Sequence, residues 1–247
     1  DVSIENLDVL FAIDRAGLVG GDGATHQGVY DMAYLRALPN LEIAMPRDAE
    51  QLRGMVAKAL ELGGPKAVRW PRGSVDPAPE TDVDAWQEID WGRAEVLKQG
   101  SDVWLLGLGP TVGYALEAAG DDPRVGVVDA RFVKPLDEEL ILRLARTGAH
   151  LVTIEDHNLP GGFGSAVAEV LIDHGVPARL TRLGVPDVIV PHGDPAAQHE
   201  TFGFGPEALR ERLSAWLDGD EESATGASLP ARDETGTQPA LGARRAR

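Results

Sequence analysis

One glycine-rich loop near the start of the chain carries residues that could transfer protons. The loop spans residues 14–27 (DRAGLVGGDGATHQ) and contains Asp22, Thr25 and His26. It lies between a predicted strand and a predicted helix, at the rim where open α/β sheets bind ligands. Asp22 and Thr25 could orient the His26 imidazole for acid–base catalysis near neutral pH, although the alternative is a solvated, uninvolved histidine.

Two arginines at the end of another predicted strand form a possible phosphate site. Arg69 and Arg72 stand in the segment RWPRG of a strongly acidic chain. An arginine fork suits a phosphate because it makes parallel, charge-assisted hydrogen bonds. Solvated arginines that balance nearby acids are the alternative.

Two glycine motifs favour structural turns over cofactor sites. The triplet at 21–23 (GDG) resembles the start of a metal–diphosphate motif, but Asn40 comes too early to complete it. In the segment 107–113 (GLGPTVG), the glycine spacing departs from the dinucleotide pattern and Pro110 removes a phosphate-binding amide. We therefore predict no metal site in this chain.

The other histidines lack a setting like that of His26. The chain contains no cysteine, which excludes disulfides and thiolate metal sites. The histidines to which we assign no role are His150, His157, His174, His192 and His199.

The elements that must position these residues follow from the hydrophobic pattern. Short apolar runs alternate with segments of helical periodicity, which predicts an α/β fold with parallel strands. Thr25 is the predicted N-cap of the first helix. The predicted strands cover residues 9–13, 41–45, 67–70, 103–106, 125–129 and 151–155. The predicted helices cover residues 28–38, 111–119, 137–146, 164–174 and 206–217. One more predicted helix opens at residues 46–48 and ends at residue 62.

Composition shifts divide the chain into two predicted units. A proline-rich and acidic stretch without apolar periodicity predicts an interdomain connection, and the polar C-terminal segment predicts disorder. The predicted organisation is a first domain at 1–73, a linker at 74–90, a second domain at 91–217 and a tail at 218–247.

Charge and hydropathy exclude several classes of partner. The net charge of −17 argues against nucleic-acid binding. No apolar run approaches the roughly 18–20 residues that span a bilayer. The lack of cysteine and of a visible secretory signal fits a cytoplasmic protein, and the first residue, Asp1, suggests a start within a longer protein.

Several segments together resemble the 1-deoxy-D-xylulose-5-phosphate synthases of the transketolase superfamily. In the first unit they are DRAGLVGGDGATHQGVYDMAYLRALPNLEIAMPRD and GPKAVRWPRG, which resemble a partial pyrimidine-binding domain. In the second unit they are VVDARFVKPLDEELI, LVTIEDHNLPGGFGSAVAEVL and LGVPDVIVPHG, which resemble a transketolase C-terminal domain. The resemblance extends from residue 1 to about residue 217.

The resemblance implies a thiamine-diphosphate- and Mg²⁺-dependent transferase. Such enzymes condense pyruvate with glyceraldehyde 3-phosphate and release carbon dioxide, in the biosynthesis of isoprenoid precursors, thiamine and pyridoxal. By matching motifs, His26 is the implied acid or base and Asp22 the implied substrate contact. Arg72 is the implied ligand of the acceptor phosphate, with Arg15 a weaker candidate.

The chain departs from the family because it lacks the glutamate that activates the cofactor and the domain that holds the diphosphate. Both are expected before Asp1, and Glu5 does not match the glutamate motif. We therefore expect a C-terminal fragment of a homodimeric parent, inactive by itself. The alternatives are a β-type subunit of a split transketolase-like or 2-oxoacid dehydrogenase-like enzyme, and a noncatalytic α/β interaction module.

Overall fold

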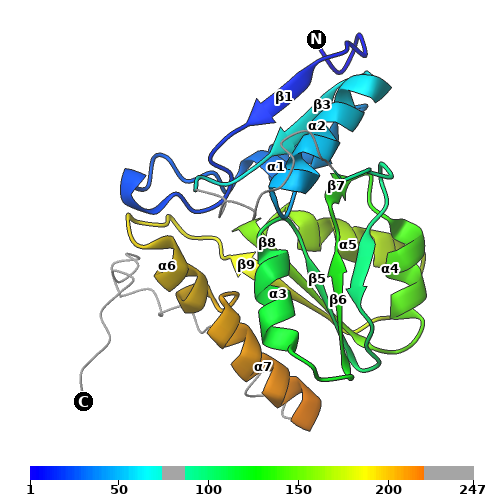
Figure 1. The fold of residues 1–247 in the computed structure, drawn as a ribbon, viewed down its shortest axis with the longest axis vertical. Helices are drawn as coiled ribbons and strands as arrows, with labels where there is room; N and C mark the ends of the chain where they lie inside the picture. Colours follow the sequence, from blue (N-terminus) through cyan, green and yellow to red (C-terminus); the bar gives the residue numbers. More distant parts are fainter. Residues whose placement is uncertain (74–86, 220–247) are drawn as a thin grey trace.

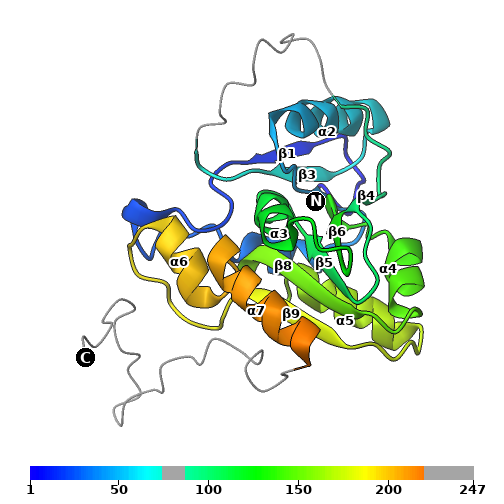
Figure 2. The ribbon, with the colours of Figure 1, turned by 60° about the horizontal axis from the view of Figure 1, so that its bottom comes forward.

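The computed structural model describes residues 1–73 and 87–219, which form two β-sheets with helices packed against them (Figure 1). The α/β fold class predicted from the sequence is confirmed. The smaller sheet contains the first strands of the chain, and the larger sheet is built from later residues (Figure 2). Residues 220–247 of the predicted tail at 218–247 and most of the predicted linker lie outside the described residues.

The first sheet has four strands in the order β1–β3–β2–β7. β1 and β2 both run parallel to β3, so the carboxyl ends of these three strands lie at one edge. β7 pairs with β2 in the antiparallel direction, although its residues belong to the second predicted unit. The strands are β1 (Leu10–Ile13), β2 (Glu42–Ala44), β3 (Lys66–Arg69) and β7 (Phe132–Lys134).

The second sheet has five strands in the order β4–β6–β5–β8–β9. All neighbours are parallel except β4, which runs antiparallel to β6 at one edge. β5 and β6 are apolar and fully buried, as expected for strands covered on both faces. The strands are β4 (Glu95–Lys98), β5 (Val103–Gly107), β6 (Val125–Asp129), β8 (His150–Asn158) and β9 (Leu180–Val185).

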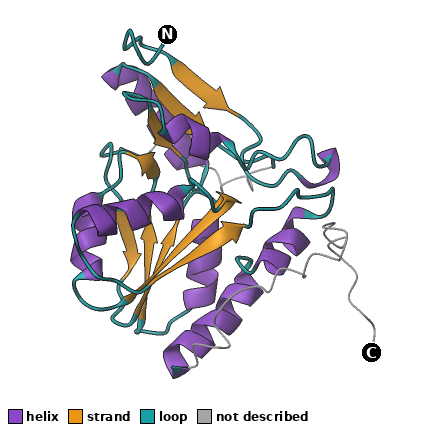
Figure 3. Cartoon of the chain, turned by 180° about the vertical axis from the view of Figure 1, so that it is seen from behind, coloured by secondary structure: helices purple, strands orange, loops and turns teal. Residues whose placement is uncertain are grey.

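Helices cover both faces of the second sheet (Figure 3). Alternate residues of β5 point to opposite faces: Val103 and Leu105 join the core with α3 and α7, while Trp104 and Leu106 join the core with α4 and α5. The helices are α1 (Asp31–Arg36), α2 (Ala49–Leu62), α3 (Thr111–Ala119), α4 (Glu138–Ala145), α5 (Phe163–Asp173), α6 (Pro195–Phe202) and α7 (Pro206–Asp218).

The core is continuous between the two sheets. Met32, Ile43 and Ala67 of the first unit belong to the same apolar cluster as Phe163 and Val167 of α5. The opposite face of the first sheet packs against α2. The two units therefore meet through a buried apolar surface.

The structure corrects several sequence predictions. The first helix begins at Asp31 rather than at Gly28, because Gly28 pairs in an isolated bridge with Gly17, and Thr25 is not its N-cap. The strands predicted from the sequence run parallel to one another as expected, and the antiparallel strands β4 and β7 are additions to that prediction. β4, β7, β9 and α6 were not predicted; β7 has only three residues and α6 lacks an apolar stripe.

Candidate functional site

The ends of two adjacent strands bring Arg15 and Arg72 to the same edge of the first sheet. β1 and β3 are parallel neighbours, and each arginine lies two or three residues beyond the end of its strand. The backbone links continue past the strands, because Trp70 donates to Ile13 O and Ala16 donates to Trp70 O. The sheet topology therefore places two arginines that are far apart in the sequence at one rim.

Asp22 joins these two arginines through a single carboxylate oxygen. Its Oδ2 lies 2.7 Å from Arg72 Nη1 and 3.3 Å from Arg15 Nη1. Both arginine side chains are about half exposed, at 50% and 52%. Exposed ion pairs contribute only about 0–1 kcal/mol to stability, so the cluster is poorly explained by stability alone.

His26 lies four residues after Asp22 and is exposed. Its Nδ1 lies 3.0 Å from Thr25 Oγ1, so Thr25 contacts the imidazole as the sequence suggested. Asp22 instead contacts the two arginines. With Nδ1 bound to the hydroxyl, Nε2 is left as the nitrogen that can meet a ligand.

Arg69 does not belong to this exposed cluster, so its prediction as a phosphate ligand is wrong. Its side chain is fully buried, and its Nε and Nη2 donate to Asp31 at 2.9 and 3.0 Å. Nη2 also donates to Gly28 O at 3.1 Å. Arg69 therefore ties β3 to the start of α1 and to the end of the loop.

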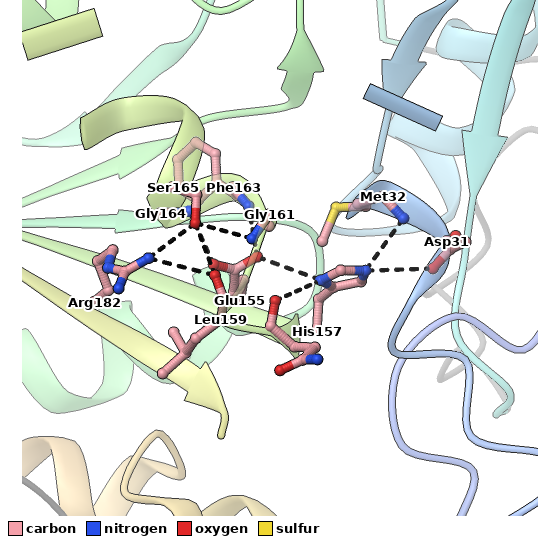
Figure 4. A network of polar contacts seen from close by, with 12 residues as sticks. Asp31, Met32, Glu155, His157, Leu159, Gly161, Phe163, Gly164, Ser165 and Arg182 are labelled. Carbon is pink, nitrogen blue, oxygen red and sulfur yellow. Dashed lines mark hydrogen bonds and ion pairs between the residues drawn. The ribbon is translucent and has the colours of Figure 1, made fainter. Parts of the chain in front are cut away.

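His157 connects the start of α1 to the second unit (Figure 4). Its Nε2 accepts a hydrogen bond from Met32 N at 3.1 Å, and its Nδ1 lies 2.8 Å from Asn158 O. These partners require a neutral ring that carries its proton on Nδ1. Burial lowers the pKa of His157 to about 4, which is consistent with a neutral ring.

Glu155 lies on the other side of His157 and caps α5 (Figure 4). Its carboxylate accepts hydrogen bonds from Phe163 N at 2.6 Å and Gly164 N at 2.8 Å. Complete burial raises the pKa of Glu155 to about 7, although the two amides act in the opposite direction. Glu155 thus fixes α5 against the end of β8.

Sequence reasoning missed the three consecutive polar residues at the end of β8. Glu155 bonds to α5 and His157 bonds to α1, while Asp156 bonds to Leu18 N in the glycine-rich loop. A usable signal existed, since a run of buried polar residues after LVTI needs partners from other elements. Sequence alone could not identify these partners.

No group of three or more His, Asp or Glu that could hold a metal ion occurs within 1–73 and 87–219. Over the same part of the chain, no helix is long and apolar enough to cross a membrane.

Comparison with known families assigns both units. Residues 1–77 match the transketolase pyrimidine binding domain, and residues 92–209 match the transketolase C-terminal domain. One similar solved structure is described as a split gene transketolase, an inactive β4 tetramer, and it superposes on this chain with a TM-score of 0.71 at 34% sequence identity. The match covers 88% of this chain and 68% of that chain. The chain belongs to the transketolase family. A transketolase mutant from Pichia stipitis, at 18% identity and a TM-score of 0.68, supports the fold; the match covers 92% of this chain and 33% of that one.

Two curated relatives are named 1-deoxy-D-xylulose-5-phosphate synthase. The chain is 55% identical over 215 residues to the 1-deoxy-D-xylulose-5-phosphate synthase of Thermus thermophilus, covering 87% of this chain and 34% of the relative. It is 47% identical over 221 residues to the synthase of Symbiobacterium thermophilum, covering 88% of this chain and 34% of the relative. The chain thus spans about a third of the length of these relatives.

Proposed function

We propose that this chain contributes the acceptor-binding part of a 1-deoxy-D-xylulose-5-phosphate synthase. The reaction is the condensation of pyruvate with glyceraldehyde 3-phosphate, with release of carbon dioxide, in isoprenoid precursor biosynthesis. The observation that carries the proposal is the convergence of Arg15 and Arg72 on Asp22, four residues before His26. Identity to proteins named as this synthase supports the choice of reaction.

Each residue of the cluster has a role in this proposal. Arg15 and Arg72 bind the phosphate of the acceptor, because two guanidinium groups can offer it several charge-assisted hydrogen bonds. Asp22 holds the two arginines together and contacts the substrate. His26 donates or accepts a proton at the reacting oxygen through Nε2.

The proposed cofactor is thiamine diphosphate with Mg²⁺. Thiamine diphosphate supplies the carbanion chemistry when bound. By its likeness to the family, we propose that the diphosphate and Mg²⁺ are held outside the described residues, by a separate domain of a cytoplasmic, homodimeric parent. The chain by itself is then inactive.

Two alternatives remain distinct from this proposal. A β-type subunit of a split enzyme is favoured by the likeness to the split gene transketolase chain, of which this chain covers 68%. It would use the same cluster with a separate partner chain. A noncatalytic interaction module would need no thiamine diphosphate.

The test joins this chain to the preceding two thirds of the Thermus thermophilus synthase. The chimaera should release carbon dioxide from pyruvate and glyceraldehyde 3-phosphate only when thiamine diphosphate is present. His26→Ala should lower turnover by roughly a hundredfold or more, as expected for loss of a proton-transfer group. The matched control is His174→Ala, which removes an exposed histidine at the end of α5. Equal activity of the His26 variant and the control would exclude the assigned role.

A further inference from the structure

The second unit, together with the first, holds the loop that carries Asp22 and His26. Leu18, near the start of this loop, and Val29, just after its end, are both buried in the core formed by α3, α7 and one face of the second sheet. Figures 1 and 2 both show the loop beside α6. The loop therefore departs from the first sheet and packs on the transketolase C-terminal domain.

Asp156 contacts the neck of the loop from β8, as does Asn158, whose N–H donates to Val29 O at 2.9 Å. The neck is closed by two backbone hydrogen bonds of 2.8 Å between Gly17 and Gly28. Next to it, Leu18 N lies 3.2 and 3.1 Å from the two carboxylate oxygens of Asp156. Gly17 has a φ of +83°, and a Cβ added there would lie 2.1 Å from Asp156 Oδ2, so the carboxylate fits closely against the backbone.

Two other elements of the second unit fix the Asp156 side chain. Asp156 is 8% exposed, and its Oδ2 lies 3.2 Å from His199 Nε2 on α6. The other ring nitrogen of His199 lies 3.1 Å from the Tyr114 hydroxyl on α3. Tyr114 O–H can therefore donate to His199 Nδ1, leaving Nε2–H to donate to the carboxylate.

A second set of contacts holds the far side of the loop. Val19 N donates to Gln27 Oε1 at 2.9 Å, and Gln27 Nε2 donates to Pro191 O at 3.3 Å. Gly193 N also donates to Gly20 O at 3.3 Å. These contacts fix the loop on both sides, while His26 at its tip stays exposed.

We propose that Asp156, held by His199 and Tyr114, is a positioning residue for the acceptor site. Asp156 touches no residue of the Arg15–Asp22–Arg72 cluster in the contacts described above. It acts by fixing the backbone from which Asp22 and His26 project. The part of this inference that concerns catalysis rests on the proposed function, whereas the structural part does not.

Hydrogen–deuterium exchange of the 247-residue chain tests the structural part without any activity. Asp156→Ala should raise amide exchange of the segment 17–28 by roughly ten- to hundredfold, the range expected when hydrogen bonds to a charged group are lost. Asp156→Asn keeps an acceptor for Leu18 N and nearly the same volume, so exchange should rise less. The matched control is Glu155→Gln, one residue away on β8, which alters contacts to α5 and should leave the loop unchanged.

The outcomes separate this inference from the proposed function. Unchanged exchange of the loop in both Asp156 variants, or equal increases in Asp156→Asn and Glu155→Gln, would overturn the positioning role. In the active chimaera, Asp156→Asn should raise KM for glyceraldehyde 3-phosphate severalfold more than KM for pyruvate, while Glu155→Gln should not. An equal increase in KM for the two substrates would also contradict the positioning role of Asp156. A chimaera without synthase activity would contradict only the proposed function.

Discussion

The buried carboxyl group of Glu155 should make the stability of the second unit depend on pH. Burial raises the pKa of Glu155 from its ordinary value of 4.5 to about 7. The unfolded chain releases this proton at lower pH than the folded chain. Stability from this group is therefore fully present below pH 4.5 and is lost as pH rises toward and through about 7.

Glu155→Gln removes the titrating group and leaves the side-chain volume nearly unchanged. Each pKa unit corresponds to about 1.36 kcal/mol, so the shift predicts that wild type loses about 2 kcal/mol more than the variant between pH 5.5 and 8. The range begins above the isoelectric point of about 4.7, where solubility is lowest. The variant also loses one good acceptor for Phe163 N or Gly164 N, and this cost is the same at every pH.

Urea unfolding followed by circular dichroism measures this difference across the pH range. At each pH, the free energy of unfolding of the variant is subtracted from that of wild type, which removes the contributions of other buried groups. One such group is His150, because burial lowers its pKa to about 4. Parallel pH profiles for the two proteins would refute the reasoning. That result would mean that the two backbone amides offset the effect of burial on the pKa of Glu155.

Two further predictions concern a buried ion pair within the first unit and a glycine that packs against the second unit, and both are checked by the same unfolding measurement. Arg69→Met should lower the free energy of unfolding by about 3–5 kcal/mol, because it leaves the Asp31 carboxylate buried and unpaired. Adding Asp31→Asn to this variant should recover part of the loss. If the effects of the two substitutions were fully additive, the pairing would be contradicted. Gly17→Ala should destabilise the protein by more than about 1 kcal/mol, because the backbone at residue 17 is left-handed and the new methyl group would clash with Asp156. The control Gly113→Ala lies at an exposed position of α3 with open space around the new methyl group, and it should stabilise the protein by up to about 1 kcal/mol. Equal effects of the two substitutions would contradict this account.

The sequence was sufficient to predict the strands and helices with strong apolar patterns. β5, β6 and α3 lie close to where periodicity placed them, since their side chains are buried by the sheet and its covering helices. β7 could not be predicted because it has three residues and pairs with a strand nearly ninety residues earlier. Pairings of that kind depend on tertiary contacts that local pattern does not encode.

The candidate site shows the same division. Motif resemblance predicted roles for Arg15, Asp22, His26 and Arg72, and the structure brings Arg15 and Arg72 together on Asp22. The buried state of Arg69 was not predictable, because Arg69 and Arg72 look equivalent at the end of one strand. Only the fold reveals that Asp31 lies within hydrogen-bonding distance of Arg69.

The preference of the chimaera for a phosphorylated acceptor tests the central claim most directly. The measurement compares kcat/KM for glyceraldehyde 3-phosphate with kcat/KM for glyceraldehyde. It is made on wild type, on Arg72→Gln and on the control Arg146→Gln, which changes an exposed arginine at the end of α4. The account predicts that Arg72→Gln lowers kcat/KM for the phosphorylated acceptor by roughly ten- to hundredfold and hardly changes that for glyceraldehyde. An equal loss for both acceptors, or no loss for either, would contradict the account.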